Sequence, residues 1–423
     1  MSIGQESQTI RPQKRHFVER TNNSNLMQIV MGQAPVQPQI ITGQAPVWIN
    51  KITTFIYKTI AKPIAIDKPY INVHSVVIRQ AGKEGVNVNW KGLDEQYSLK
   101  PGTVCEKTTY ENGSLHRFNS AAKSVIGLLV LKLLSDNSKI KLETPILGVL
   151  GLNEEQKEEY KAWKNVTIKH CLNMTAGFEW DETGSYSTTN SNASSDKTQK
   201  NDASQSYLVD DLFEYILTKE ISDTPGEKFN YSGGCSMLLG KIIETISGKS
   251  VEEYAQEVLF TPLGINRDHV RWRKTASGFT GCSGGLSMRP SDMAKIGQLL
   301  LNKGKWGDDI ILKEECIEDL FLTEGSVLKG EKDKDLKWGF DAYKFGWWTQ
   351  KIKLKDGTDL IAHVVQGYGG QNLFVIPDHN LVVVINTGNY AATDVSTKQT
   401  PKRLLINEIL PGLGIATRPF PYV

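Results

Sequence analysis

Ser120 and Lys123 are three positions apart at the start of an apolar run that extends to Leu134 and predicts a buried helix. Side chains at positions i and i+3 of a helix lie on one face, so the lysine amine can reach the serine hydroxyl. A desolvated lysine can take the proton of that hydroxyl and make it a strong nucleophile. The unpaired N–H groups of the first helical turn can stabilise an oxyanion. The two residues therefore predict a nucleophilic serine with its activating base.

The same spacing of serine and lysine occurs at two other places, Ser194 with Lys197 and Ser326 with Lys329. Both pairs lie in polar sequence with no apolar helix behind them. Because such a short motif indicates catalysis only in the right structural context, we assign the nucleophile to Ser120.

Two further motifs occur where an acyl-transfer serine would need partners. The stretch Pro225–Gly233 places Tyr231 just before a predicted helix, and Gly367–Gln371 leads directly into a predicted strand. Together with Ser120–Lys123, these segments resemble the three motifs of serine β-lactamase-like hydrolases. That superfamily includes class C β-lactamases, D-Ala-D-Ala peptidases, family VIII esterases and 6-aminohexanoate-dimer hydrolases.

The resemblance extends over roughly residues 70–412, with the motifs in the family's order along the chain. It implies a β-lactamase/transpeptidase-like fold of the α/β (α+β) class. Such a fold has an antiparallel sheet built from both chain ends, flanking helices, and an inserted, mostly helical region at about residues 135–330. Further stretches typical of the family are Cys171–Gly177, Leu239–Gly248, Pro262–Ile265, Gly284–Met288, Ser291–Gly297 and Trp338–Trp348.

The resemblance also implies a role for each motif residue. Ser120 attacks a carbonyl carbon and forms an acyl-enzyme, while Lys123 and Tyr231 share the proton transfers; which of them is the first base stays open. The backbone N–H groups of Ser120 and Gln371 form the oxyanion hole. No metal or organic cofactor is expected.

The chain departs from the family pattern at two positions that contact substrate. Gly233 stands where class C enzymes and peptidases have the asparagine of Tyr-x-Asn, and Tyr368 replaces the lysine or histidine that precedes Gly369 and Gly370. A lysine there would bind the carboxylate of a penicillin or a D-Ala terminus. We therefore expect these four residues to line a site for esters or amides, as in the esterase and aminohexanoate-oligomer hydrolase branch, without efficient β-lactamase or D,D-peptidase activity.

A long polar loop is predicted at residues 183–206, which are rich in Ser, Thr, Asn and Asp. Related hydrolases often carry substrate contacts in this place, so Asp181, Glu182 and Tyr186 are candidates for binding an amine or amide. The alternative is a solvated surface loop with no part in binding.

Strands near both chain ends and helices between them follow from the hydrophobic pattern. We expect one hairpin from Ile71–Ile78 and Gly85–Trp90, and a second from Leu373–Pro377 and Leu381–Ile385. An extended segment is expected at Lys139–Ile146. Helices are expected at 166–172, 207–219, 233–246, 250–259, 290–303 and 397–409.

The composition of the 423-residue chain is that of a water-soluble globular protein, with 39% apolar and 23% charged residues. A net charge of +2 gives no electrostatic argument for nucleic acid or an anionic membrane as a partner. No run approaches the roughly 18 uninterrupted apolar residues of a membrane span. We expect a polar arm at residues 1–46 and one hydrolase domain at 47–423 that acts on a small-molecule ester, amide or peptide; the oligomeric state stays open.

Five scattered cysteines without a Cys-x-x-Cys pair argue against a zinc site or a disulfide framework and favour a reducing compartment. The first residues lack the basic-then-apolar pattern of a secretory signal. We therefore expect a cytoplasmic protein, with a periplasmic or secreted one as the alternative.

The residues and the resemblance together predict a serine hydrolase that cleaves an ester or amide bond through Ser120. Two alternatives remain. An acyltransferase or peptide cyclase of the penicillin-binding-protein type would use the same acyl-enzyme but pass the acyl group to an amine. A catalytically silent scaffold would keep the fold for binding alone.

Overall fold

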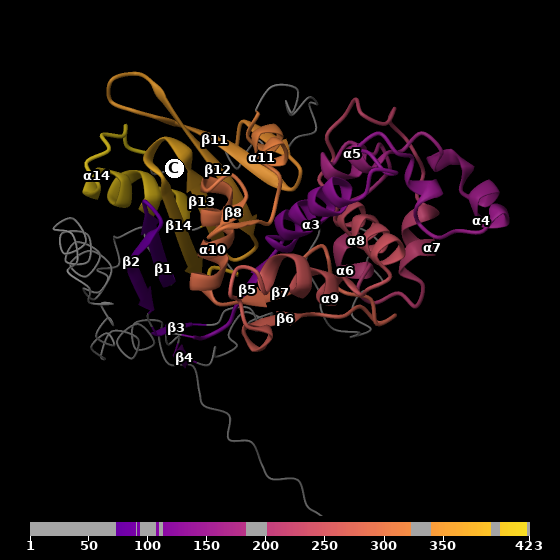
Figure 1. Ribbon diagram of the computed structural model, residues 1–423, viewed down its shortest axis with the longest axis horizontal. Helices are drawn as coiled ribbons and strands as arrows, with labels where there is room; N and C mark the ends of the chain where they lie inside the picture. Colours follow the sequence, from indigo (N-terminus) through magenta and orange to yellow (C-terminus); the bar gives the residue numbers. More distant parts are fainter. Residues whose placement is uncertain are drawn as a thin grey trace, which may run out of the picture. The chain divides into compact units, whose positions relative to one another are not determined.

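A seven-stranded antiparallel sheet runs through the computed structural model, and segments near both ends of the chain contribute strands to it (Figure 1). This is the sheet expected from the resemblance. Across the sheet the strands are β10 (Ala342–Lys344), β11 (Trp347–Lys353), β12 (Asp359–Gly367), β13 (Gln371–Ile376), β14 (Leu381–Thr387), β1 (Val73–Gln80) and β2 (Lys83–Asn89).

The structure describes residues 73–89, 91–93, 107–109, 113–182, 201–322, 340–390 and 398–420. The expected arm at 1–46 and Tyr186 lie outside the described residues.

The described part of the chain also contains three small sheets. They pair β3 (Lys91–Leu93) with β4 (Lys107–Thr109), β7 (Leu286–Met288) with both β5 (His116–Asn119) and β6 (Val270–Trp272), and β8 (Lys305–Trp306) with β9 (Asp309–Ile310).

Both hairpins predicted from the sequence are present. Ile78 pairs with Val86 across β1 and β2, and Leu373 pairs with Val384 across β13 and β14. Val384 also lies opposite Val77 of β1, so β14 joins the strands from the two ends of the chain. The β-branched side chains of these strands favour extended backbone and pack well on a pleated surface.

One face of the sheet is covered by α10 (Pro290–Leu301), which contacts β1, β13 and β14. Gly297 permits the close approach of this helix. A β-carbon added at Gly297 would lie 2.8 Å from Val382 and 2.9 Å from Leu373. Residues 382 and 373 therefore point towards α10.

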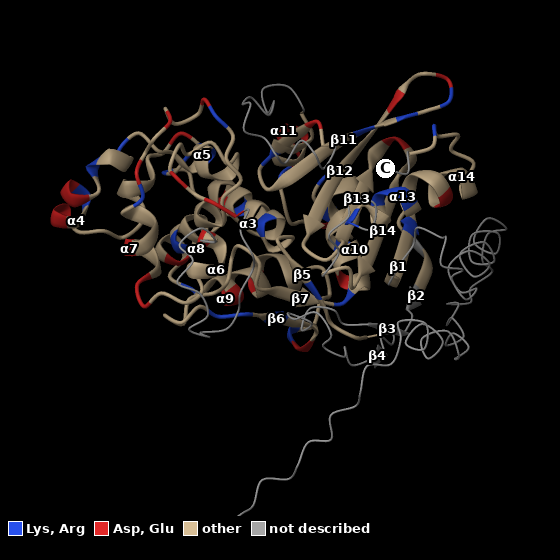
Figure 2. Cartoon of the chain, turned by 180° about the vertical axis from the view of Figure 1, so that it is seen from behind, with Lys and Arg blue, Asp and Glu red and all other residues tan. Residues whose placement is uncertain are grey.

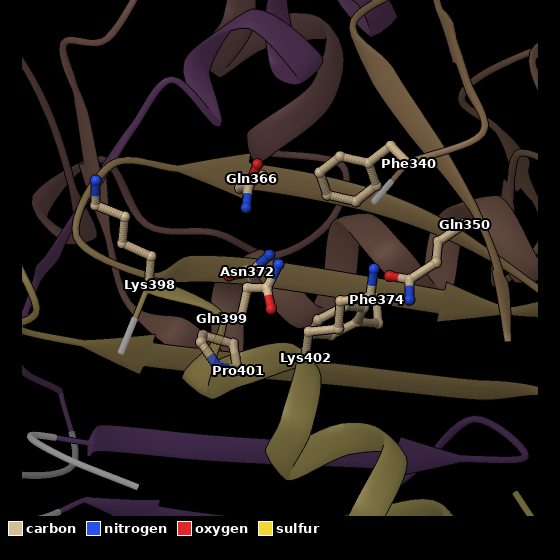
Figure 3. A pocket seen from close by; sticks show the side chains of 9 residues that line it. All are labelled: Phe340, Gln350, Gln366, Asn372, Phe374, Lys398, Gln399, Pro401 and Lys402. Atoms are coloured by element: carbon tan, nitrogen blue, oxygen red, sulfur yellow. The ribbon is translucent and has the colours of Figure 1, made fainter. Parts of the chain in front are cut away.

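The other face is covered by the C-terminal helical segment. Alternate residues of a strand point to opposite faces, so Asn372 and Phe374 point away from α10. They line a small pocket together with Pro401 at the start of that segment (Figure 3). The segment consists of α13 (Thr400–Arg403), a π-helical stretch (Leu404–Ile409) and α14 (Leu410–Gly412).

Most of the helices lie between the strands from the two chain ends in sequence, and Figure 1 shows them beside the sheet. The helix after Ser120 contacts both α8 and β11, and is apolar and buried around most of its circumference, as a helix between two layers must be. These helices are α3 (Ala122–Asp136), α4 (Glu154–Glu159), α5 (Ile168–Leu172), α6 (Asp202–Gln205), α7 (Leu212–Leu217), α8 (Gly233–Ser247), α9 (Val251–Ala255, followed by a π-helical stretch at Gln256–Phe260) and α11 (Glu314–Phe321).

The segment Lys139–Ile146 is not extended as predicted. It folds into turns with an isolated bridge from Pro145 to Thr167, and continues into a 3₁₀ turn at Ile146–Gly148. Pro145 has no backbone N–H with which to extend a ladder, and this limits the pairing.

The region 201–219 also differs from the prediction of a loop followed by one long helix. Residues 201–206, expected within the loop, contain α6, which begins after Asn201 because the side chain of Asn201 accepts the N–H of Ser204. The expected helix at 207–219 begins only at Leu212, since Asp211 caps it by accepting the N–H groups of the next turn.

Positions of basic and acidic residues are interspersed along the described elements (Figure 2). This mixing agrees with the net charge of +2. Within the described stretches, no helix is both long enough and apolar enough to span a lipid bilayer.

Candidate active site

Ser120 lies on a tight turn between β5 and α3. Its carbonyl oxygen accepts the N–H of Lys123 at 3.0 Å, just as the helix begins. Asn119, directly before the serine, has a φ of 49°, a left-handed conformation that asparagine tolerates better than most residues. The Asn119 side-chain amide donates a hydrogen bond of 2.8 Å to the carbonyl oxygen of Tyr368. The serine turn is therefore tied to the third motif.

Lys123 is almost completely buried, with 3% of its surface exposed. Its Nζ lies 3.4 Å from Oγ of Ser120 and donates a 2.9 Å hydrogen bond to the carbonyl oxygen of Ser283. The approach of amine to hydroxyl that the spacing predicted is confirmed. The burial keeps this amine out of bulk water.

Tyr231 lies next to the lysine. Nζ of Lys123 is 4.5 Å from the centre of the Tyr231 ring. The ring stacks on Trp348 at 5.6 Å and packs edge-on against Tyr343 at 6.0 Å. Ser232, the following residue, caps α8 by accepting the N–H of Cys235, so the start of this helix fixes the backbone beside Tyr231.

Glu182, expected as a substrate contact, places its carboxylate inside the site. Only 8% of its side chain is exposed, and Oε2 lies 3.8 Å from Nζ of Lys123. Oε1 accepts a 2.9 Å hydrogen bond from Nε1 of Trp180 and a further one from the N–H of Gly233. Gly233, the position that departs from the family pattern, is thus in contact with this carboxylate.

Ser283 is a site residue that sequence reasoning did not single out. Besides accepting from Lys123 through its carbonyl oxygen, it donates from Oγ to the hydroxyl of Tyr207 at 3.3 Å. Burial raises the pKa of Tyr207 to about 12, so this phenol stays neutral. In the sequence, the neighbouring stretch Gly284–Met288 is typical of the family and indicates this segment. It does not identify the carbonyl group of Ser283 that binds the lysine.

The third motif forms a glycine turn that other residues could not adopt. Gly369 and Gly370 both have a φ of 85°. A β-carbon at Gly369 would lie 2.3 Å from the ring of Tyr390, and one at Gly370 would lie 2.1 Å from Oγ1 of Thr387. Tyr368 is 44% exposed, and its hydroxyl donates to the carbonyl oxygen of Tyr390. The hydroxyl proton is thus held by the backbone.

Gln371, predicted to supply an oxyanion N–H, begins β13 at the end of the same turn. Its buried side chain donates to the carbonyl oxygen of Thr387 at 2.6 Å and accepts from the amide of Asn386 at 2.8 Å. Gly367 on the neighbouring strand packs tightly on β5, because a β-carbon there would lie 2.0 Å from the carbonyl oxygen of Phe118. These contacts place the third motif beside the strand that leads to Ser120.

Asp181 and Tyr186 were the other expected substrate contacts. Asp181 is exposed, and its N–H donates to the carboxylate of Asp202 at 2.8 Å. Tyr186 lies outside the described residues.

The pocket of Figure 3 lies on the face of the sheet that the C-terminal helical segment covers, and neither Ser120 nor Lys123 lines it. Among the described residues no group of three or more His, Cys, Asp or Glu side chains is arranged to hold a metal ion.

Comparison with protein families gives one match that covers most of the chain. The family model described as Beta-lactamase matches residues 90–404. Protein flp of Staphylococcus aureus (strain N315) is 27% identical over 218 residues, which are 50% of this chain and 36% of that protein. The 6-aminohexanoate-dimer hydrolase of Paenarthrobacter ureafaciens is 23% identical over 41% of this chain and 42% of its own length. The match thus spans less than half the length of these curated relatives.

Solved structures share the fold over more of the chain. A provisionally assigned 6-aminohexanoate-dimer hydrolase from Bacillus anthracis has a TM-score of 0.62 at 21% identity, over 81% of this chain and 80% of that one. EstCE1, described as a hydrolase with promiscuous acyltransferase activity, has a TM-score of 0.57 at 14% identity, over 84% and 96%. FmtA from Staphylococcus aureus has a TM-score of 0.55 at 17% identity, over 95% and 100%.

Proposed function

The chain belongs to the β-lactamase family, and from this premise we propose that it is a serine hydrolase that cleaves an ester or amide bond through an acyl-enzyme on Ser120. The observation that carries the proposal is the distance of 3.4 Å between Nζ of the buried Lys123 and Oγ of Ser120. Nζ beside the hydroxyl can take part, together with Tyr231, in moving the hydroxyl proton as the oxygen attacks.

The proposed reaction has two halves. Oγ of Ser120 attacks the substrate carbonyl carbon, the bond to the leaving alcohol or amine breaks, and the hydroxyl proton passes to that leaving group by way of Lys123 and Tyr231. Water then attacks the acyl-enzyme, the ester bond to Oγ breaks, and Oγ regains a proton as the acid leaves. The N–H groups of Ser120 and Gln371 are the proposed donors to the oxyanion in both halves.

The substrate class follows from the two departures from the family motifs. Position 233 offers no side-chain amide to a substrate carbonyl, and Tyr368 carries no positive charge for a carboxylate. The proposed substrates are therefore esters and amides whose binding does not require a positive charge at position 368. Short-chain esters should acylate Ser120, while cephalosporins should do so weakly or not at all.

Intact-mass spectrometry tests this proposal directly. The protein is incubated with a panel of esters, amides and β-lactams, and with a fluorophosphonate, and Ser120→Ala serves as the control. We expect a covalent adduct with short-chain esters and with the fluorophosphonate, and none in the variant. An unlabelled wild-type protein, under conditions that label a known serine hydrolase, would instead support a catalytically silent scaffold.

Acyl transfer is the second candidate, because it would use the same acyl-enzyme. EstCE1, which shares the fold, is described as a hydrolase with promiscuous acyltransferase activity, and acyl transfer can be tested on the same site. Adding an amine acceptor to the ester assay separates the two functions. A hydrolase releases the free acid, whereas a transferase converts most of the acyl group to the amide.

A further inference from the structure

We propose that Glu182 is a positioning residue that holds Lys123 and the backbone next to Tyr231 in one fixed arrangement, in the space that the missing side chain of Gly233 leaves open. This inference rests on the proposed function, because Lys123 and Tyr231 are its proton-transfer residues. It assigns to Glu182 a role other than the substrate contact that the sequence suggested.

The first support is the set of groups that meet at this one carboxylate. Oε2 faces Nζ of Lys123 on α3 at 3.8 Å, and Oε1 accepts from the N–H of Gly233, the first residue of α8. Nε1 of Trp180 donates to Oε1 as well. Tyr231 is only two residues before Gly233, so the carboxylate connects the backbone segments that carry both proton-transfer residues. Hydrogen bonds to an ionised group are stronger than those between neutral partners.

The second support is the space around Gly233. A β-carbon added there would lie 2.8 Å from Oε1 of Glu182 and 2.9 Å from Cβ of Ser283. A larger side chain at position 233 and the carboxylate of Glu182 cannot occupy this place together. Where enzymes of the resembled families use the asparagine of Tyr-x-Asn, this chain therefore has a glycine and a carboxylate supplied from another segment.

The third support is that other residues hold the backbone at Glu182 in place. The Asn201 side chain donates to the carbonyl oxygen of Glu182 at 3.1 Å, and the preceding N–H, of Asp181, donates to Asp202. Asp202 is in turn paired with Lys219 at 2.6 Å. Asn201 and Asp202 are both nearly buried. The position of the carboxylate is thus fixed by Trp180, which binds it directly, and by Asn201 and Asp202, which hold the backbone that carries it.

Glu182→Gln is the sharpest test, because the amide keeps an oxygen for Gly233 and Trp180 but removes the charge that faces Lys123. Misplaced proton-transfer groups should lower kcat with an ester substrate by about 10- to 100-fold, while KM stays within about threefold. The matched control is Glu179→Gln, an exposed carboxylate three residues earlier, which should leave both constants unchanged. Wild-type kcat in Glu182→Gln, or a change in KM alone, would overturn the proposal.

Glu182→Asp covers the case in which loss of the charge prevents folding. The aspartate keeps a carboxylate near the buried Lys123 but is one methylene too short to reach both Lys123 and Gly233. We expect a folded protein, by circular dichroism, with a reduced kcat and an unchanged KM. A folded Glu182→Asp variant with wild-type kcat contradicts the positioning role.

A thermal measurement tests the shared space without reference to activity. Gly233→Ala should lower the Tm of the wild-type protein more than it lowers the Tm of Glu182→Ala, where the nearest obstacle is gone. Equal decreases in Tm would contradict the idea that a side chain at position 233 and the Glu182 carboxylate compete for one space.

The two proposals fail differently. A wild-type protein that neither reacts with the fluorophosphonate nor turns over esters refutes the hydrolase function. An active wild type with an equally active Glu182→Gln refutes only the role of Glu182.

Discussion

At the scale of single residues, the direction in which Ser120 points depends on the residue before it. Asn119 holds a positive φ and donates its side-chain amide to the backbone of Tyr368. The same residue therefore shapes the turn that exposes the nucleophile and fixes that turn to the glycine motif. Such conformations are costly for residues with a β-carbon, and they persist where surrounding contacts compensate the cost.

Replacing Asn119 separates these two contributions. Asn119→Gly keeps the left-handed conformation but loses the hydrogen bond, whereas Asn119→Ala loses the bond and adds strain of about 1 kcal/mol. Urea unfolding should therefore show Asn119→Ala to be the less stable variant, with the lower kcat/KM for esters. Equal stabilities of the two variants would show that the backbone conformation is not under strain.

Tyr368 allows a test of charge recognition at the third motif. Tyr368→Lys places a cation on an exposed position where resembled enzymes bind a carboxylate. We expect acylation of Ser120 by benzylpenicillin to become about tenfold faster, which corresponds to one added charge-assisted contact of roughly 1.4 kcal/mol. Tyr368→Gln, which lacks the charge, is the control, and a similar rate in both variants would contradict the charge argument. Stopped-flow or timed intact-mass measurements give these rates.

At the scale of elements, α3 carries Lys123, begins two residues after Ser120, and is docked on the turn between β10 and β11. Oγ of Ser124 donates to the carbonyl oxygen of Gly346 at 2.6 Å. A β-carbon at Gly127 would lie 2.0 Å from the carbonyl oxygen of Phe345, so the helix touches this turn directly. Close backbone approach at a helical glycine fixes the depth of α3, and with it the position of Lys123.

Gly127→Ala should therefore disturb both stability and activity. The added methyl group cannot be accommodated without moving α3 or the turn, and we expect a loss of about 2 kcal/mol or more in the free energy of unfolding. Gly148→Ala is the matched control, because nothing lies within 4 Å of a β-carbon there and its φ is not positive. Urea denaturation of both variants checks this, and a Gly127→Ala protein as stable as the wild type would refute the close docking.

At the scale of the whole molecule, a buried histidine links folding to pH. His363 of β12 stacks on Phe321 of α11 with ring centres 4.0 Å apart, and burial lowers its pKa from 6.5 to about 4. The unfolded chain therefore binds a proton near pH 6.5 that the folded chain binds only near pH 4. Stability due to His363 is complete above pH 6.5 and is lost as the pH falls to about 4.

Acid unfolding of His363→Phe measures this contribution. Phenylalanine keeps a flat ring on Phe321 and does not titrate, so the wild type should lose roughly 3 kcal/mol relative to the variant between pH 6.5 and 4. The other buried histidines are the same in both proteins and cancel in the difference. A difference in unfolding free energy that does not change with pH would show that His363 is not protected from protons in the folded state.

Much of the fold was predictable because it follows from local pattern. The hairpins of β1–β2 and β13–β14 follow from short runs of β-branched and other apolar residues bounded by turn residues, and α3 and α8 from longer apolar segments. Errors arose where a single residue decides a boundary, as at Pro145, which has no backbone N–H, and at Asp211, which caps α7. Caps and isolated bridges involve single hydrogen bonds that composition does not reveal.

By itself the sequence determined the Ser120–Lys123 pair, because the two residues are three positions apart at the start of an apolar run that predicts a helix, and this spacing brings both side chains to one side. It also predicted a turn before the strand that begins at Gln371, and its glycines at 369 and 370 can adopt the positive φ that the structure shows there. Only the tertiary structure decided that Glu182 faces Lys123, that the carbonyl oxygen of Ser283 accepts from the same amine, and that Asn119 reaches Tyr368. These contacts join segments far apart in the chain, and their geometry depends on how whole layers pack, which no local pattern encodes.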